Sequence, residues 1–399
     1  MNRVCSIFSQ IVGCFSRAEF GALVKKHKAE RHARGFSCWS QFIAMLFCQL
    51  GRAHSLREIC GGLASCEGKL RHLGLQDSPR RSTLAYANEH RPWELYRDVF
   101  FSQQGRIESE AGVRPGHKFR FRNKLVSMDA STVALCVSMY DWAQFQRAKG
   151  AVKLHLMLDH DGYLPCFAVI TTGKKHEITV ARQIRFQPGT IVVFDKGYAD
   201  YAWWKQLRQE KVFFVTRLRE DAKLEVQGKR EIPERHRHIL SDEDIKLTGH
   251  RQLGQDGLSG LRRIRIRDEA QNRELVFVTN LTHLAASTIA DIYRERWQIE
   301  TFFKSLKQLL KIKTFVGTSQ NAVMTQIWTA LIVMLMLRWL RLKAKFGWSL
   351  ANLVALLRQQ LFVYRDLWKW LDAPFEGPPA VQDMQLVLPL EAPTAWTAQ

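Results

Sequence analysis

The chain has 399 residues, with 59 lysines and arginines against 38 aspartates and glutamates, so its formal net charge is +21. This length allows two or three domains, and 46% hydrophobic residues with 12 tryptophans exclude a mere basic, disordered tail. The excess of positive charge indicates a polyanionic partner, most commonly nucleic acid, although a ribosomal or membrane-surface protein has the same balance.

The eight cysteines contain no close Cys-x-x-Cys pair. They indicate idle thiols in a reducing cytoplasm, and they disfavour a zinc site through Cys60 and Cys66. The N-terminus lacks the basic start, apolar run and cleavage site of a signal peptide. The longest apolar stretch, 328–337, is shorter than the roughly 20 residues that span a bilayer. We therefore expect a buried core helix there and a cytoplasmic protein that is not associated with a membrane.

Residues 1–112 predict a helical N-terminal domain. An apolar helix is expected over 39–50, and Ser55 is expected to cap a helix over 56–63 with Glu58 in the capping-box position. Pro79 precedes a basic helix over 80–91, which is either a DNA-groove-reading helix or a plain surface helix of a bundle. Its candidates for contacts with phosphates or base edges are Arg80, Arg81, Asn88 and Arg91.

From about residue 120 the pattern changes from helices to strands. Three strands joined by hairpin turns, followed by helix, strand, helix and strand, predict a mixed α/β core whose first part covers 113–219. The expected strands are 124–128, 152–158, 164–171, 190–194 and 212–216, and the expected helices are 177–184 and 199–209.

Residues 220–282 predict a strand-rich insertion. Its strands are expected over 223–226, 245–248, 261–267 and 275–281. The alternation in Arg262-Arg-Ile-Arg-Ile-Arg267 predicts a half-exposed strand with one basic side. The second part of the core, 283–318, is expected to hold one long helix capped by Ser287. Residues 319–399 predict further helices to about 372 and a proline-rich, loosely ordered tail.

The long helix carries Tyr293, Arg296, Glu300 and Lys307 at offsets of 3, 4 and 7 residues. At about 100° per residue, these four side chains fall within an arc of roughly 60°. Another arc is apolar and suits docking on a core; it holds Ile292, Ile299, Phe302, Phe303, Leu306, Leu309 and Leu310. The charged arc fits metal-assisted chemistry on a phosphodiester, while a solvated face with stray ion pairs is the simpler reading. Trp297, beside it, is either a boundary residue or a stacking surface for a base.

Three carboxylates form the candidate catalytic group. Asp129 and Asp195 each follow an apolar strand, and ligands gather at the carboxyl ends of strands in open α/β sheets. With Glu300, they would suit two Mg²⁺ or Mn²⁺ ions about 3.5–4 Å apart that serve an in-line displacement. A single aspartate at a strand end is more commonly a turn or cap residue, so the combination carries the prediction.

Two further pairs of residues each allow two interpretations. Lys153 and His155 alternate with apolar neighbours, so they either point toward the site or form a plain surface pair. His176 and Glu177 either approach the metals or serve as helix-capping residues.

These residues together resemble bacterial insertion-sequence transposases of the insertion-sequence-four family. Tyr293, Arg296, Glu300 and Lys307 reproduce its Tyr-x2-Arg-x3-Glu-x6-Lys signature, and the first 75 residues or so resemble an N-terminal domain of one branch. The other segments that carry the resemblance are Ser127-Met-Asp-Ala-Ser-Thr132, Val152-Lys-Leu-His-Leu156 and Asp195-Lys-Gly-Tyr198.

The resemblance implies a ribonuclease-H-like core with a β-rich insertion before the glutamate, and an Asp-Asp-Glu triad formed by Asp129, Asp195 and Glu300. It assigns these three residues to catalysis and to metal binding. It also implies that Tyr293, Arg296 and Lys307 hold phosphates near the cleaved DNA end, while Trp297 stacks on a displaced base.

The implied activity is cut-and-paste DNA transposition. Members of the family bind the terminal inverted repeats of their element and cleave the 3′ strand. They then form and open a hairpin and transfer the strand into target DNA. The resemblance therefore implies a homodimer that acts on double-stranded DNA in the cytoplasm, at the nucleoid. Two other functions stay open: a non-catalytic DNA-binding regulator derived from a transposase, and a metal-dependent nuclease that cuts without joining. The complete set of three acids argues against the regulator.

Overall fold

The computed structural model describes most of the chain. The described residues are 5–31, 33, 35–66, 68–110, 117–135, 142, 144–146, 149–234, 236–249, 257–269, 271–310 and 315–376. The predicted loose tail beyond 376 lies outside them.

Short polar residues start most of the N-terminal helices. Ser6, Ser16, Ser37 and Ser55 each accept a hydrogen bond from a backbone N–H three residues further on. The capping box at Ser55 is confirmed in altered form, because the Glu58 carboxylate reaches the N–H of His54, at 2.9 Å, rather than that of Ser55. The helices are α1 (Ile7–Gly13), α2 (Arg17–Lys26), α3 (Cys38–Leu50), α4 (Leu56–Ala64), η1 (Leu70–Leu73), α5 (Arg81–His90) and α6 (Glu94–Ser109).

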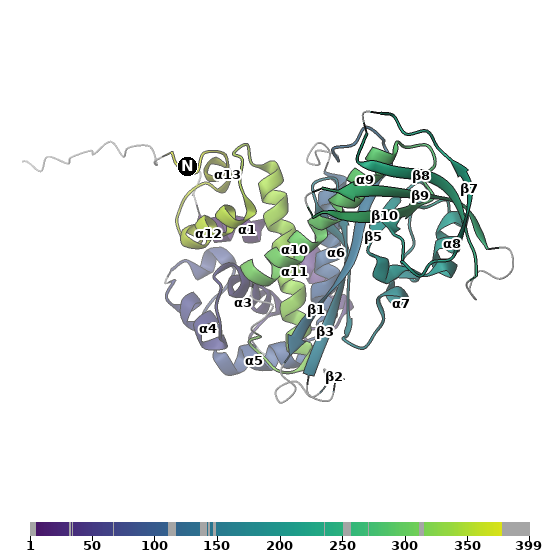
Figure 1. The fold of residues 1–399 in the computed structure, drawn as a ribbon. Coiled ribbons are helices and arrows are strands. Elements are labelled where there is room, and N and C mark those ends of the chain that lie inside the picture. The colour runs from purple at the N-terminus through teal and green to yellow at the C-terminus, as the bar shows by residue number, and fades with distance from the viewer. Residues whose placement is uncertain are drawn as a thin grey trace, which may run out of the picture.

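The two ends of the chain form one helical layer (Figure 1). After α11 (Gln320–Lys343), the chain forms α12 (Leu350–Gln360) and α13 (Leu367–Asp372). The N–H groups of Ile7 and Phe8 at the start of α1 donate to the carbonyls of Val363 and Leu361, at 3.0 and 2.7 Å. The segments predicted as N-terminal and C-terminal regions therefore pack together.

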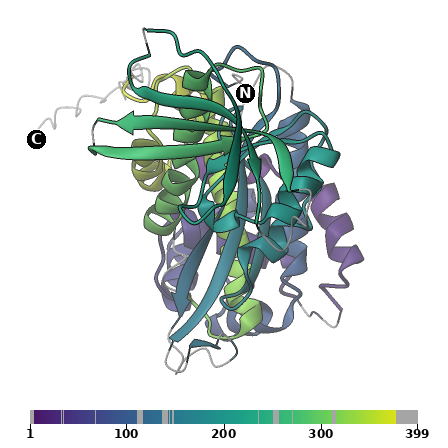
Figure 2. The same ribbon diagram turned by 45° about the vertical axis from the view of Figure 1, so that its right-hand side comes forward.

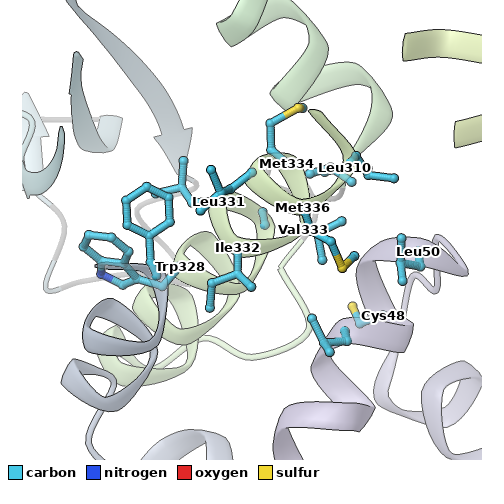
Figure 3. Close-up of a cluster of buried hydrophobic side chains, with 14 of the residues drawn as sticks. Cys48, Leu50, Leu310, Trp328, Leu331, Ile332, Val333, Met334 and Met336 are labelled. Carbon is cyan, nitrogen blue, oxygen red and sulfur yellow. The ribbon is translucent and has the colours of Figure 1, made fainter. Parts of the chain in front are cut away.

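Helix α11 is the centre of this layer. Eighteen of its 24 residues are buried, and it packs against α3, α5 and α6 (Figure 3). The Trp328 side chain is 1% exposed and lies among the rings of Trp93, Phe100 and Phe101. By length and composition α11 would pass as a membrane span, but 94% of its most apolar window is buried inside the protein. The predicted core helix is confirmed, and it extends beyond the predicted 328–337 at both ends.

The sheet has the ribonuclease-H-like strand order. Strands β1 (Leu125–Leu135), β3 (Lys149–Asp159) and β4 (Leu164–Thr172) form an antiparallel meander, and the short β2 (Gln144–Gln146) pairs with the start of β3. After α7 (Glu177–Ala181), β5 (Ile191–Phe194) pairs parallel with β1. After α8 (Tyr201–Gln209), β6 (Phe213–Arg217) pairs parallel with β5. The order β4-β3-β1-β5-β6, with helices as crossovers, confirms the predicted mixed α/β core.

The strands of the predicted insertion extend this same sheet. Beyond β6 the order continues β10-β9-β8-β7, all antiparallel, and Figure 2 shows these strands running across the direction of β1 and β3. Their bounds are β7 (Leu224–Lys229), β8 (Ile239–Leu247), β9 (Leu258–Asp268) and β10 (Arg273–Thr279). On the expected basic side of β9, Arg263 and Arg265 pair with Glu243 and Glu274. Arg262 lies on the opposite, buried face and pairs with Asp242.

The predicted single long helix is wrong in one respect. It is divided into α9 (Ala286–Glu295) and α10 (Trp297–Leu309), with Arg296 at the junction. Ser287 does not cap it, because the N-cap position is Ala285, which makes no side-chain hydrogen bond. The apolar stripe is confirmed for Ile292, Ile299, Phe302, Phe303, Leu306 and Leu310, which are buried, and the side chain of Leu309 lies outside the described part of the protein.

We expect Trp328→Ala to lower the free energy of unfolding by about 3–5 kcal/mol, because it leaves a cavity in the core around α11. Urea unfolding followed by circular dichroism measures this change. Trp297→Ala is the matched control, since that side chain is 63% exposed. An equal loss for both variants would contradict the central role of α11.

Candidate active site

The end of the parallel ladder between β1 and β5 brings two carboxylates together. The last registered pair is Met128 with Phe194, so Asp129 and Asp195 are the next residues on neighbouring strands. Strand β5 ends there, whereas β1 continues to Leu135. Asp129 therefore lies inside a strand rather than at its end, which corrects the sequence prediction while keeping the two acids adjacent.

Arg296 and Tyr293 connect the third acid to this pair. Arg296 Nη2 lies 2.6 Å from Glu300 Oε1, and Arg296 Nη1 lies 4.0 Å from Asp129 Oδ2. The Tyr293 hydroxyl donates to Asp195 Oδ1 at 3.3 Å. Arg296 and Glu300 are four residues apart and share one helix face, and this face meets β1, so one guanidinium lies between the carboxylates of α10 and β1. The structure thus brings together Asp129, Asp195, Glu300, Tyr293 and Arg296.

Burial sets the electrostatics of Asp129. Loss of solvation raises the pKa of its carboxyl to about 6, and the charges of Glu177 and Glu300 add to that rise. A hydrogen bond from the N–H of Ala130, at 2.8 Å, and the charge of Arg296 oppose it without cancelling it. A carboxylate in this state gains from any added cation, so the site has the chemistry of a divalent-metal centre.

Arg296 acts as the counter-charge of the neighbouring carboxylates. Burial alone would lower the pKa of Arg296, but Tyr293, Glu300 and Asp129 together hold it above its usual value. Burial also raises the pKa of Tyr293 to about 12, so its hydroxyl keeps its proton. Among the described residues, no three acidic, histidine or cysteine side chains converge closely enough to hold one ion. The carboxylates are neighbours, and the guanidinium lies between two of them.

A buried network that the sequence did not reveal holds the end of α9. Glu295 Oε2 accepts a hydrogen bond from the Tyr163 hydroxyl at 2.7 Å, and Glu295 Oε1 pairs with Lys118 Nζ at 2.5 Å. His160 Nδ1 lies 3.9 Å from the same carboxylate, and its Nε2 lies 2.6 Å from Ser127 Oγ on β1. These contacts anchor the residue before Arg296 to the sheet. The only trace of this network in the local sequence was Glu295 itself, which directly precedes Arg296.

Comparison with known proteins identifies the family. The family described as "Transposase DDE domain" matches residues 120–336, which include every residue of this site. The chain belongs to the DDE transposase family. A second family, described as a domain of unknown function, matches residues 4–76 of this transposase.

Two relatives and one solved structure are similar to this transposase. A putative transposase of Sinorhizobium fredii is 30% identical over 329 residues, which are 81% of this chain and 88% of the relative. A probable transposase for insertion sequence element IS5377 of Geobacillus stearothermophilus is 31% identical over 62% of this chain and 64% of its own. A piggyBac transposase synaptic complex with hairpin DNA aligns with 98% of the chain and 85% of its own, at 12% identity and a TM-score of 0.44.

Family membership makes the protein an enzyme of phosphoryl transfer on DNA that uses divalent metal. Two further candidate residues, Lys307 and Trp297, border the site of this transposase. Lys307 lies along β1, with its ammonium 2.6 Å from Ser131 Oγ and 3.0 Å from the Thr132 carbonyl. Trp297 begins α10 with its side chain 63% exposed.

A basic cleft opens next to Tyr293 and Arg296. It has a volume of about 890 Å³ and lies between α9 and the strands β6, β9 and β10. Glu234, Asp268 and Glu269 are its acidic members. Trp297 stands in its wall, together with the basic residues Arg217, Arg237, His238, Arg267, Arg273, Arg294 and Arg296. The excess of cations suits a nucleic-acid backbone.

The N-terminal candidates divide into two groups. Arg80 and Arg81 are exposed at the start of α5. Arg91 instead donates to the carbonyls of Phe36 and Ser37. Asn88 is 2% exposed and accepts from Gln41 Nε2 at 2.9 Å. The geometry gives Arg91 and Asn88 a role in holding α5 against α3, so neither is free to reach DNA.

The structure also gives the positions of the pairs Lys153/His155 and His176/Glu177, for which the sequence allowed two interpretations each. His155 is 3% exposed and its Nε2 lies 2.9 Å from the Thr171 hydroxyl, so it is a satisfied interior histidine. His176 occupies the N-cap position of α7 without a side-chain hydrogen bond. Lys153 Nζ lies 3.3 Å from Glu177 Oε1.

We expect Glu295→Gln to lower stability by about 1–3 kcal/mol at neutral pH, because it leaves Lys118 without its buried counter-charge. His160, Lys118 and Tyr163 lower the pKa of Glu295 from 4.5 to about 2 against the opposing effect of burial. Its charge therefore stabilises the folded state fully above pH 4.5, and that contribution is lost as the pH falls through about 2. Urea midpoints should differ most near neutral pH and converge in acid. A difference that does not change with pH would contradict the ionised network.

Proposed function

We propose that this transposase is a member of the insertion-sequence-four group that moves its own element by cutting and pasting DNA. Asp129, Asp195 and Glu300 are the catalytic residues in this proposal. The observation that carries it is the register of β1 and β5, which makes the two aspartates neighbours, with Arg296 and Tyr293 joining Glu300 to them.

Two Mg²⁺ or Mn²⁺ ions are the proposed cofactors, held by Asp129, Asp195 and Glu300. When bound, such ions activate the attacking oxygen and stabilise the leaving oxygen of an in-line displacement at phosphorus. The protein's part is to supply the carboxylates, and the raised pKa of Asp129 indicates that its oxygens are poorly solvated. The Arg296 guanidinium keeps the group neutralised and gives a phosphate a fork-shaped donor.

The DNA end is proposed to lie across Tyr293, Arg296 and Lys307 and to continue along the basic cleft. Lys307 is placed on the same face of β1 as Asp129, because Ser131 lies two residues further along the strand. Trp297 offers an exposed ring at the cleft wall for a base displaced from the duplex. A displaced base is what a hairpin intermediate requires, so we include hairpin formation and opening in the proposed reaction.

The proposed partners are the terminal inverted repeats of the element and a target duplex. A homodimer is proposed for the complex that joins two ends, and the cytoplasm, at the nucleoid, for its location. Arg80 and Arg81 are the proposed N-terminal contacts, because both are exposed at the start of α5.

We expect Asp129→Asn, Asp195→Asn and Glu300→Gln each to reduce strand cleavage by about a thousandfold or more, because each removes several kcal/mol of transition-state charge stabilisation. Cleavage is read as nicks and hairpins on a denaturing gel, with the element's own end DNA and Mn²⁺. End binding, measured by gel shift, should persist. Asp221→Asn is the matched control, since Asp221 is exposed and pairs with Arg219.

The outcomes separate the candidate functions. Binding without metal-dependent nicking by the unaltered protein would indicate the regulator, and nicking without joined products would indicate the nuclease. Unfolding of all three variants would indicate structural carboxylates.

We expect Lys307→Gln to weaken end binding and to reduce the slope of log affinity against log salt by about 0.9, because one phosphate contact is lost. Arg81→Gln should act in the same direction. Lys26→Gln is the control, since that exposed lysine pairs with Asp98 on the helical layer. An unchanged slope for Lys307→Gln would contradict a phosphate contact there.

A further inference from the structure

A gap in the sheet opens beside the candidate active site. Because β5 ends at Phe194 while β1 runs on to Leu135, the residues of β1 after Met128 have no parallel neighbour. The short helix η3 (Lys196–Tyr198) and α7 pack on the face of the sheet opposite α10, because their Tyr198 and Ala181 share a buried cluster with Met128, whereas α10 packs with Val133 and Leu135. Side chains of α7 therefore have a route to the same carboxylates that Glu300 approaches from the other face.

Glu177, the first residue of α7, uses this route. A Cβ placed on Gly197 would lie 3.7 Å from Glu177 Oε2, so this carboxylate lies directly over the loop that carries Asp195. Its charge also raises the pKa of Asp129. Lys153 of β3 holds its other oxygen at 3.3 Å. Glu177 is thus close to Asp129 and Asp195 without belonging to the signature helix.

Tyr198 supplies an independent observation at the same place. Its side chain is 2% exposed, and within the described part of the chain its hydroxyl has no hydrogen-bond partner. Tyr198 follows Gly197, the residue next to the Glu177 carboxylate, and it lies three residues after Asp195. Burial raises the pKa of its hydroxyl, and the charges of Asp129, Glu177 and Asp195 raise it further. A buried, unsatisfied hydroxyl among carboxylates marks a position for an ordered water or a hydrated ion.

We propose that Glu177 is a fourth acidic residue of the divalent-metal centre, with Tyr198 donating to the water or carboxylate oxygens beside it. This inference rests on the proposed function of the triad. Lys153 then serves as the counter-charge of Glu177 when the site holds no metal, as Arg296 does for Glu300. The rival explanation is that Glu177 only neutralises Lys153 in a local ion pair.

The test measures Mn²⁺ binding to the full-length protein without DNA, from the loss of the free-ion signal in electron paramagnetic resonance. Glu177→Gln should weaken binding by about tenfold or more, because loss of a supporting group at a metal site costs that much. Glu177→Asp, which keeps the charge but shortens the side chain, should also weaken it. Glu210→Gln is the matched control, since its side chain is 31% exposed, as is that of Glu177, and it also pairs with a basic residue.

The salt dependence of Mn²⁺ binding distinguishes direct participation of Glu177 in the metal centre from a long-range effect of its charge. In about 1 M salt the screening length falls to roughly 3 Å, so a distant effect would vanish while the loss from Glu177→Gln at the metal would persist. Lys153→Met should strengthen Mn²⁺ binding, because it removes a competing cation. Circular dichroism of each variant checks the fold.

Two results overturn this inference in different ways. If Asp129→Asn weakens Mn²⁺ binding but Glu177→Gln leaves it unchanged, Glu177 is not part of the centre and the triad stands. If neither substitution changes Mn²⁺ binding, the proposed metal centre itself is wrong.

Discussion

The Arg296 guanidinium is the interaction on which the site depends. Asp129 and Glu300 come from different elements, and burial makes the Asp129 carboxylate costly to keep charged, with the charge of Glu300 adding to that cost. One cation between them offsets that cost and links α10 to β1. Helical spacing favours this arrangement, because Arg296 and Glu300 are four residues apart and lie on one helix face. The network around Glu295 holds the residue before Arg296 in place.

Much of the fold follows from local patterns in the sequence. Apolar runs located the five core strands, and the spacing of Ile299, Phe302, Phe303 and Leu306 located the buried face of α10. The extension of β1 beyond Asp129 was missed because the small and polar residues Ala130, Ser131 and Thr132 interrupt the apolar run and resemble the start of a loop. The helix break was missed because a 100° periodicity continues through Arg296 whether or not the axis bends. Contacts between distant segments set both features.

The site was predictable only in part for the same reason. The two aspartates could be placed at strand ends from their neighbours in sequence, but only the register of β1 with β5 makes them adjacent. Tyr163, His160 and Lys118 gave no signal, because each contributes through a partner far along the chain. Arg91 and Asn88 looked available for DNA on a basic helix, and burial against α3 directs them inward.

The packing of α11 against the N-terminal helices has a consequence for truncated forms of the protein. Helix α11 covers the apolar faces of α3, α5 and α6. A polypeptide that stops before residue 320 therefore exposes a broad hydrophobic surface. Such a fragment cannot persist as a folded competitor for element ends, and quality-control proteases would remove it. A shortened inhibitor from this gene would have to retain the helical layer and lose part of the sheet instead.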